Sequence, residues 1–136
     1  MNSQIKGSEY MLLFRGTDWH KGLSPEEIQT VMGQWKAWFD RLTAQGIAKA
    51  GHPLETDARI VSAKSGRVVV ADGPFAEAKE TVGGYFFLNV ESLEAAVAIA
   101  KQCPGLQHGA IVEVRPVAAE CPLAQEVGAE LAHATA

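Results

Sequence analysis

The strongest candidate for a reactive site in this sequence is a short segment with four ionisable residues, Asp72, Glu77, Lys79 and Glu80. Gly73 and Pro74 follow Asp72 directly, which predicts a sharp turn at the end of a strand. Loops held at strand ends by a rigid scaffold often carry binding and catalytic groups. Asp72 could therefore act as a general base or orient another group. The alternative is that its carboxylate caps the turn by accepting backbone N–H groups.

Glu77 and Glu80 are three residues apart, so on a helical turn they would share one face. Two carboxylates in different environments can divide acid and base roles between them. They could equally ligate a divalent cation through oxygen atoms. The alternative is a solvated charged turn in which Lys79 pairs with a neighbour. We predict Asp72, Glu77 and Glu80 as the acid/base groups.

Five further side chains are candidates for orienting or binding a ligand: Lys79, Tyr85, His52, Arg115 and His20. Histidine is the side chain most often used for proton transfer, and arginine can hold an anion with two hydrogen bonds. Arg115 could instead pair with Glu113 on the same strand. Tyr85 could instead be a strand aromatic with its hydroxyl at the rim.

Several classes of function lack support in the sequence. No His-x-x-x-His, Cys-x-x-Cys or nucleotide-binding glycine pattern occurs, so we predict no metal site and no cofactor. Acidic residues outnumber basic ones, 16 to 12, and no basic block is present to bind a nucleic acid. No apolar run is long enough to span a membrane. The two cysteines and the polar N-terminus favour a cytoplasmic protein.

Capping and periodicity predict the elements that position these groups. Ser24-Pro25-Glu26-Glu27 is a helix start, because Ser24 and Glu27 can form a capping box and proline suits the first helical position. Apolar residues at helical spacing continue to Leu42, and Gly46 ends the helix. Trp35 falls within the apolar stripe and Trp38 borders it, where it could line a pocket, but we favour core packing for both. A second helix begins after Ser92. Strands are predicted at residues 10–15, 47–52, 58–63, 67–71, 85–90 and 109–115.

The order of these elements is β-α-β-β-β-β-α-β, with a hairpin around Lys64-Ser65-Gly66 between the two halves. It predicts an α+β, ferredoxin-like fold: an antiparallel sheet, two helices on one face and an inserted β-hairpin. We place one domain at residues 9–117 and a tail, helical or disordered, at 118–136. Strands 67–71 and 85–90 are apolar on both faces, so we expect both to be covered on both sides. A homodimer through the open sheet face would provide that cover. Otherwise, the tail would fold over that face.

Segment 72–85 contains Asp72-Gly73-Pro74-Phe75, which resembles the DGPF signature of the YCII-related family. The resemblance extends over residues 9–117 through Tyr10-Met11-Leu12-Leu13, Ser24-Pro25-Glu26-Glu27, Gly51-His52-Pro53-Leu54 and Glu113-Val114-Arg115-Pro116-Val117.

This resemblance implies a dimeric α/β barrel. It also implies, for some family members, enzymes with a His–Asp pair whose histidine lies on the first helix. Here that helix carries Trp35-Lys36-Ala37-Trp38 and no histidine, so the pair does not carry over. Other members are associated with extracytoplasmic-function sigma factors.

Two functions follow as hypotheses. The first is a cytoplasmic homodimer that binds a small molecule in a cleft by the Asp72–Tyr85 loop and carries out acid/base chemistry there. The alternative is a non-catalytic ligand-sensing or accessory module associated with an extracytoplasmic-function sigma factor. The sequence leaves open whether the protein is an enzyme.

Overall fold

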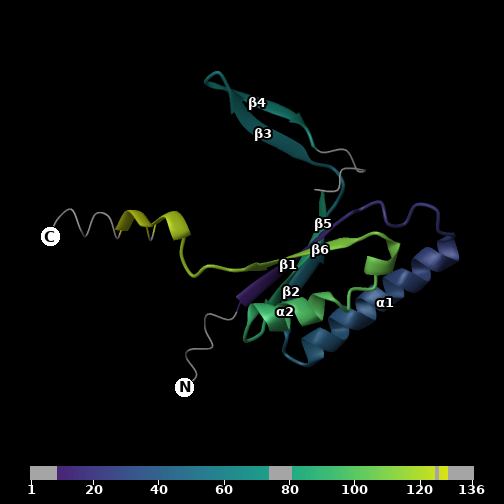
Figure 1. Cartoon of the computed structure of the whole chain (residues 1–136). Helices are drawn as coiled ribbons and strands as arrows, with labels where there is room; N and C mark the ends of the chain where they lie inside the picture. The colour runs from purple at the N-terminus through teal and green to yellow at the C-terminus, as the bar shows by residue number, and fades with distance from the viewer. Residues whose placement is uncertain (1–8, 74–80, 125, 129–136) are drawn as a thin grey trace.

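A computed structural model describes residues 9–73, 81–124 and 126–128 (Figure 1). Its elements follow the predicted order, with a short 3-10 helix added before the last strand. They are β1 (Glu9–Arg15), α1 (Pro25–Ala44), β2 (Ala48–Pro53), β3 (Arg59–Lys64), β4 (Arg67–Asp72), β5 (Val82–Asn89), α2 (Leu93–Ala100), η2 (Leu106–His108) and β6 (Ile111–Pro116). In the described part of the chain, no helix is long and apolar enough to cross a membrane.

The predicted α+β fold is confirmed. Strands β2, β5, β1 and β6 form, in that order, a four-stranded sheet in which every pair is antiparallel. The central strand β1 is bonded to β5 and β6, so Leu12 lies opposite both Phe86 and Val114. Because alternate residues of a strand point to opposite faces, this register divides the sheet into two distinct surfaces.

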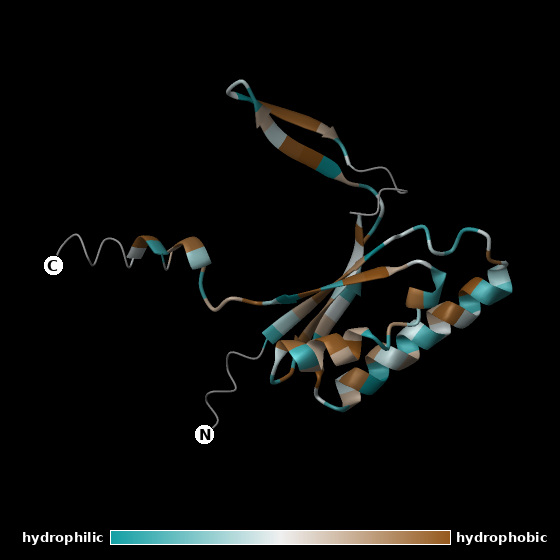
Figure 2. Cartoon of the chain, viewed as in Figure 1, coloured by the Kyte–Doolittle hydropathy of each residue, from teal (hydrophilic) through white to brown (hydrophobic). Residues whose placement is uncertain are grey.

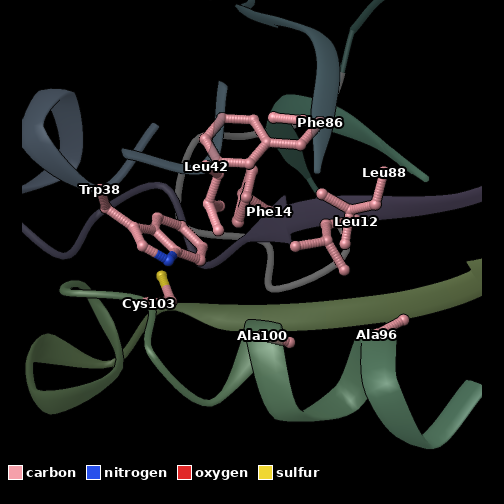
Figure 3. Packing of buried hydrophobic residues seen from close by; sticks show 10 residues of the cluster. Leu12, Phe14, Trp38, Leu42, Phe86, Leu88, Ala96, Ala100 and Cys103 are labelled. Atoms are coloured by element: carbon pink, nitrogen blue, oxygen red, sulfur yellow. The ribbon is translucent and has the colours of Figure 1, made fainter. Parts of the chain in front are cut away.

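One surface carries both helices and the hydrophobic core (Figure 3). Leu12, Phe86 and Leu88 point from the strands toward Trp38 and Leu42 of α1. Ala96 and Ala100 bring α2 close to the same cluster, because their side chains are small. The indole N–H of Trp38 donates a hydrogen bond of 3.1 Å to Gln102 Oε1, so this buried ring keeps its polar atom satisfied.

Helix α1 begins and ends where the sequence predicts. The Ser24 hydroxyl accepts from the Glu27 amide at 3.1 Å, and the Glu27 carboxylate accepts from the Ser24 amide at 2.8 Å. Gly46, just past the helix, has a φ of 77°, the left-handed conformation that glycine adopts at low cost. The capping box and this glycine fix the length of the helix that forms one wall of the candidate site.

The opposite surface of the sheet, called the open face below, carries Met11 and Leu13 of β1 and Tyr85 and Phe87 of β5. These side chains are partly buried by one another but lie outside the core cluster. Figure 1 shows the described tail residues, 117–124 and 126–128, extending away from the sheet. The tail residues that can be described therefore do not cover this surface.

Strands β3 and β4 form a separate two-stranded sheet, which projects from the end of the main sheet (Figure 1). Ser65 and Gly66 both have positive φ, 50° and 78°, as a tight two-residue hairpin turn requires. Every residue of both strands is exposed, and Val68 and Val70 have 75% and 64% of their surface accessible. The expectation that strand 67–71 is covered on both sides is therefore wrong within a single chain, because this strand pairs only with β3 and joins no larger sheet.

Candidate functional site

A cleft of about 960 Å³ opens at the end of the main sheet where β1 and β2 end and β5 begins. Helix α1 forms one wall and the connection from β2 to β3 forms another. Most of the lining is apolar, and much of it is aromatic: Phe14, Trp19, Trp35, Phe39, Tyr85 and Phe86 all contribute. A concave, largely apolar site with a few polar groups is the usual form of a small-molecule site.

Edge-to-face ring packing builds the aromatic wall. The ring centroid of Phe14 lies 4.8 Å from that of Trp35 and 4.8 Å from that of Phe86, with interplanar angles near perpendicular. Phe39 adds a further contact, with its ring 4.7 Å from Phe86. Such pairs prefer these geometries because the positive edge of one ring meets the negative face of the next. The rings of the wall thus contact one another within the chain itself.

Gly51, on β2, leaves room for these rings. A Cβ atom at this position would lie 2.6 Å from Phe86 Cδ1 and 2.9 Å from Phe39 Cε1, closer than carbon atoms approach one another. Gly84, on β5, lets β2 approach in the same way, since a Cβ there would lie 3.1 Å from the His52 carbonyl oxygen. Both glycines therefore shape the cleft, because a side chain at either position would collide with or crowd the neighbouring atoms.

His52 and Tyr85 are the polar pair of the cleft. They are direct cross-strand partners on β2 and β5, and both line the cleft from the open face of the sheet, whereas the aromatic wall lines it from the helix side. His52 Nδ1 and the Tyr85 hydroxyl are 2.9 Å apart, a hydrogen bond in which either group can be the donor, depending on the histidine tautomer. His52 is exposed and Tyr85 is half-buried. The pair can accept a proton from a bound molecule or donate one to it.

Two cations also line the cleft, one from the helix and one from the sheet. Lys36 of α1 is 2.7 Å from Asp40 and remains well exposed. Arg15 Nε lies 3.5 Å from Glu113 Oε1, an ion pair without a hydrogen bond, although this nitrogen is buried. The connection after β2 adds the carboxylates of Glu55 and Asp57 to the lining, so the described cleft carries side chains of both charges.

Of the three acidic residues predicted as catalytic, Asp72 is the one that lies within the described residues. Asp72 ends β4 with its side chain 95% exposed, 3.6 Å from Arg59 Nε, and is not among the described residues that line the cleft. Glu77, Lys79 and Glu80 lie outside the described residues.

The remaining candidates occupy other places. His20 is exposed beside Trp19, with ring centroids 5.9 Å apart, and Trp19 rather than His20 lines the cleft. Arg115 lies on β6 and donates to Glu113 Oε2 at 3.1 Å, the internal pair weighed as the alternative. Of the predicted ligand-binding residues that are described, His52 and Tyr85 come together at the cleft.

Sequence reasoning missed Trp35, Phe39, Lys36 and Arg15 as cleft residues. Core packing is confirmed for Trp38, which is 2% exposed, whereas Trp35 packs against the core and also lines the cleft. The indole N–H of Trp35 is buried and makes no hydrogen bond within the described chain. Among the described residues, no group of three or more metal-ligating side chains occurs.

Comparison with known proteins gives one family match. The family model described as the YCII-related domain matches residues 9–129. No curated protein matches the sequence.

Among solved structures, 5-chloro-2-hydroxyhydroquinone dehydrochlorinase from Burkholderia phenoliruptrix AC1100 is 18% identical. That match covers 76% of this chain and 90% of the dehydrochlorinase, with a TM-score of 0.38. The protein At3g17210 from Arabidopsis thaliana is 16% identical, with 83% and 98% covered and a TM-score of 0.32. At these identities, activity has to be argued from the residues of this chain.

Proposed function

The chain belongs to the YCII-related domain family, and on that premise we propose that its sheet-end cleft binds a small organic molecule with a flat apolar body and an acidic group. Flat rings fit the aromatic wall of Phe14, Trp35 and Phe39. Lys36 and Arg15 would attract a carboxylate or a phenolate. The combination favours an aromatic acid over a sugar or a nucleotide, because apolar and aromatic surface predominates in the lining.

The observation that carries a catalytic role is the His52–Tyr85 hydrogen bond at the edge of this apolar cleft. A histidine that shares a hydrogen bond with a hydroxyl can remove a proton from a bound molecule while the hydroxyl stabilises the charge that develops. We therefore propose that the protein catalyses proton transfer on its ligand. His52 acts as the base and Tyr85 as its orienting partner and hydrogen-bond donor.

The acidic segment, residues 74–80, could supply further groups to the cleft. The Gly73 amide donates to the Ala58 carbonyl oxygen at 2.8 Å, and Ala58 and Thr81 both line the cleft. The chain thus enters and leaves residues 74–80 beside the cleft. Glu77 and Glu80 remain candidates for a second acid/base group and Lys79 for an anion-binding group.

The exposure of Asp72, away from the cleft lining, favours one alternative: a non-catalytic module that binds the same class of molecule and does not transform it. Binding needs only the aromatic wall and the two cations. Its association with an extracytoplasmic-function sigma factor stays a prediction.

Phenylpyruvate is a suitable probe, because it joins an aromatic ring and a carboxylate to an acidic CH2 group. We expect its addition to shift the NMR signals of Gly51, Trp35 and Tyr85. Tyr85→Phe removes one hydrogen-bonding hydroxyl, worth about 0.5–1.5 kcal/mol, and should weaken binding about two- to twelvefold. Tyr10→Phe is the matched control, since Tyr10 is the other tyrosine and is not among the described cleft residues. No binding, or equal effects of both variants, would refute a ligand site at this cleft.

Catalysis is tested with the same probe in deuterated water. The wild-type protein should accelerate exchange of the CH2 protons above the spontaneous rate, and His52→Gln should return exchange to that rate while changing the dissociation constant less than about threefold. Binding without accelerated exchange would identify the protein as the non-catalytic module.

A further inference from the structure

The two cations that line the cleft differ in how well their charges are already satisfied. Lys36 lies 2.7 Å from Asp40 on the same helix, and its side chain is 77% exposed to water. Arg15 is only 28% exposed, and its Nε atom lies 3.5 Å from its ion-pair partner Glu113 without donating a hydrogen bond. A buried donor without an acceptor is unfavourable, so Arg15 has more to gain from an incoming anion than Lys36 has.

Glu113 does not neutralise Arg15 by itself, because a second guanidinium shares it. Arg115 donates a hydrogen bond of 3.1 Å to Glu113 Oε2, so this one carboxylate lies between two arginines. The direct partner of Arg15 on β6 is Ile111, and Figure 2 shows β6 beginning with a hydrophobic stretch in brown. Within the described part of the chain, these three charged side chains therefore leave an excess of positive charge at this end of the sheet.

Arg15 also lies on the same face of the sheet as the polar pair. Leu13 is the direct partner of both Tyr85 and Glu113, and Arg15 is the next residue of β1 on that face, in contact with Glu113. Side chains at such diagonal positions start about 7–8 Å apart, a gap that a long side chain and a small ligand group can close. Lys36, in contrast, belongs to α1, which covers the opposite face. A ligand that reacts at the polar pair therefore finds Arg15, and not Lys36, on its own side of the sheet.

The negative charges of the cleft lie on the other side of β5. Glu55 and Asp57 line the cleft from the connection that follows β2. Asp57 is paired with Arg59 at 2.6 Å, whereas Glu55 has no ion-pair partner within the described chain. The sheet order places β5 between β2 and β1, so a ligand over β5 has Glu55 on the β2 side and Arg15 on the β1 side. This distribution of charge directs an acid group toward β1.

We propose that Arg15 selects acidic ligands by binding their carboxylate on the open face, beside the polar pair, while the flat ring lies toward the aromatic wall. Gly83 and Gly84, which line the cleft at the start of β5, place no side chain between these two sides. The acid group then sits close to the reacting C–H group and not on the ring. This inference rests on the proposed function and narrows its ligand class to aryl-substituted carboxylic acids, of which aromatic 2-oxo acids are a simple example.

Two ligands that differ only in the acid group test this role. Phenylacetone has the ring, the ketone and the CH2 group of phenylpyruvate, with a methyl group in place of the carboxylate. Arg15→Gln should raise the dissociation constant of phenylpyruvate at least tenfold, because a charge-assisted hydrogen bond is lost. It should change that of phenylacetone less than twofold. Equal weakening of both ligands would show that Arg15 acts on the structure of the cleft and would overturn the inference.

Two further variants compare Arg15 with the other cations. Arg115→Gln is the matched control, since it removes an equal charge that contacts the same Glu113 but is not among the described cleft residues. It should change phenylpyruvate binding less than threefold. Lys36→Gln should weaken it less than fivefold, because water and salt screen the attraction of an exposed charge. An effect of either variant that equals or exceeds that of Arg15→Gln would overturn the inference.

A measurement on the wild-type chain does not depend on how the variants fold. The Nε–H NMR signal of Arg15, assigned by its absence from Arg15→Lys, should shift when phenylpyruvate is added and stay in place with phenylacetone. A signal that ignores bound phenylpyruvate would overturn the role of Arg15 and leave the proposed function standing. A wild-type chain that does not bind phenylpyruvate at all would remove both.

Discussion

Gly51 illustrates how a single missing carbon atom can shape a cleft. Its position on β2 places the backbone directly against the rings of Phe39 and Phe86, which in turn hold Phe14 and Trp35 in place. His52, the next residue along β2, points to the opposite face of the sheet, where it pairs with Tyr85. The residue that sets the shape and the residue that carries the chemistry are thus neighbours on one strand.

Replacing Gly51 with alanine should destabilise the protein by about 1–3 kcal/mol, because the added Cβ would overlap Phe86 and force the rings apart. Gly33→Ala is the matched control. Gly33 lies within α1 with nothing within 4 Å of its would-be Cβ, so alanine there should stabilise the protein by about 0.5–1 kcal/mol. Urea denaturation measures both changes. A neutral Gly51→Ala would show that the rings move freely and that the wall is not rigid.

Cys103 supplies a pH-dependent contribution to stability. Burial raises the pKa of its thiol from 9.0 to about 11, against a smaller lowering by backbone hydrogen bonds from Gly105 and Leu106. The unfolded chain ionises this thiol near pH 9 while the folded chain still holds the proton. The stabilising contribution is thus complete below pH 9 and is lost as the pH rises to 11, on the order of 2 kcal/mol.

The difference in unfolding free energy between the wild type and Cys103→Ala, measured from pH 8 to pH 11, isolates this effect from other titrating groups. At pH 8, a thiol reagent should modify the exposed Cys121 rapidly and leave Cys103 unmodified in the folded chain. A flat difference curve, or equal reactivity of both cysteines, would contradict the assignment.

At the scale of elements, the sequence predicts where a helix starts and ends better than it predicts which of its side chains face the core. Ser24 and Glu27 locate the start of α1 because a capping box is a contact between residues three apart. The position of Trp35 at the cleft could not be predicted in this way. The helix presents Val31, Trp38 and Leu42 to the core and turns Trp35 toward the cleft, and this rotation is set by the sheet rather than by the helix.

The capping box should account for a measurable share of the stability of α1. Ser24→Ala removes the hydroxyl that accepts from the Glu27 amide and should lower the unfolding free energy by about 1 kcal/mol. Ser24→Asp keeps an acceptor at the same place, beside the positive end of the helix dipole, and should restore most of the loss. Thermal denaturation of both variants provides the comparison. If aspartate and alanine behave alike, the hydroxyl is not the group that stabilises this end.

At the scale of the whole molecule, the hairpin is the part whose environment the sequence misjudges within one chain. The turn residues Lys64-Ser65-Gly66 correctly predict two paired strands. The run Val68-Val69-Val70 also predicts burial, and the single chain leaves it exposed. Burial depends on what lies beyond the chain, so an apolar strand can reveal a contact that its own fold does not contain. The acidic segment 74–80 lies outside the described residues, so the role predicted for Glu77, Lys79 and Glu80 stays a prediction.

Hydrogen exchange can separate the hairpin from the rest of the molecule. In the single chain, the amides of β3 and β4 should exchange nearly as fast as in an unfolded peptide, because this hairpin packs on no further layer. Amides of Leu12 and Phe86, between paired central strands, should exchange only on global unfolding, at least about a thousandfold more slowly. Strong protection of the hairpin amides would show that the hairpin folds independently of any further layer.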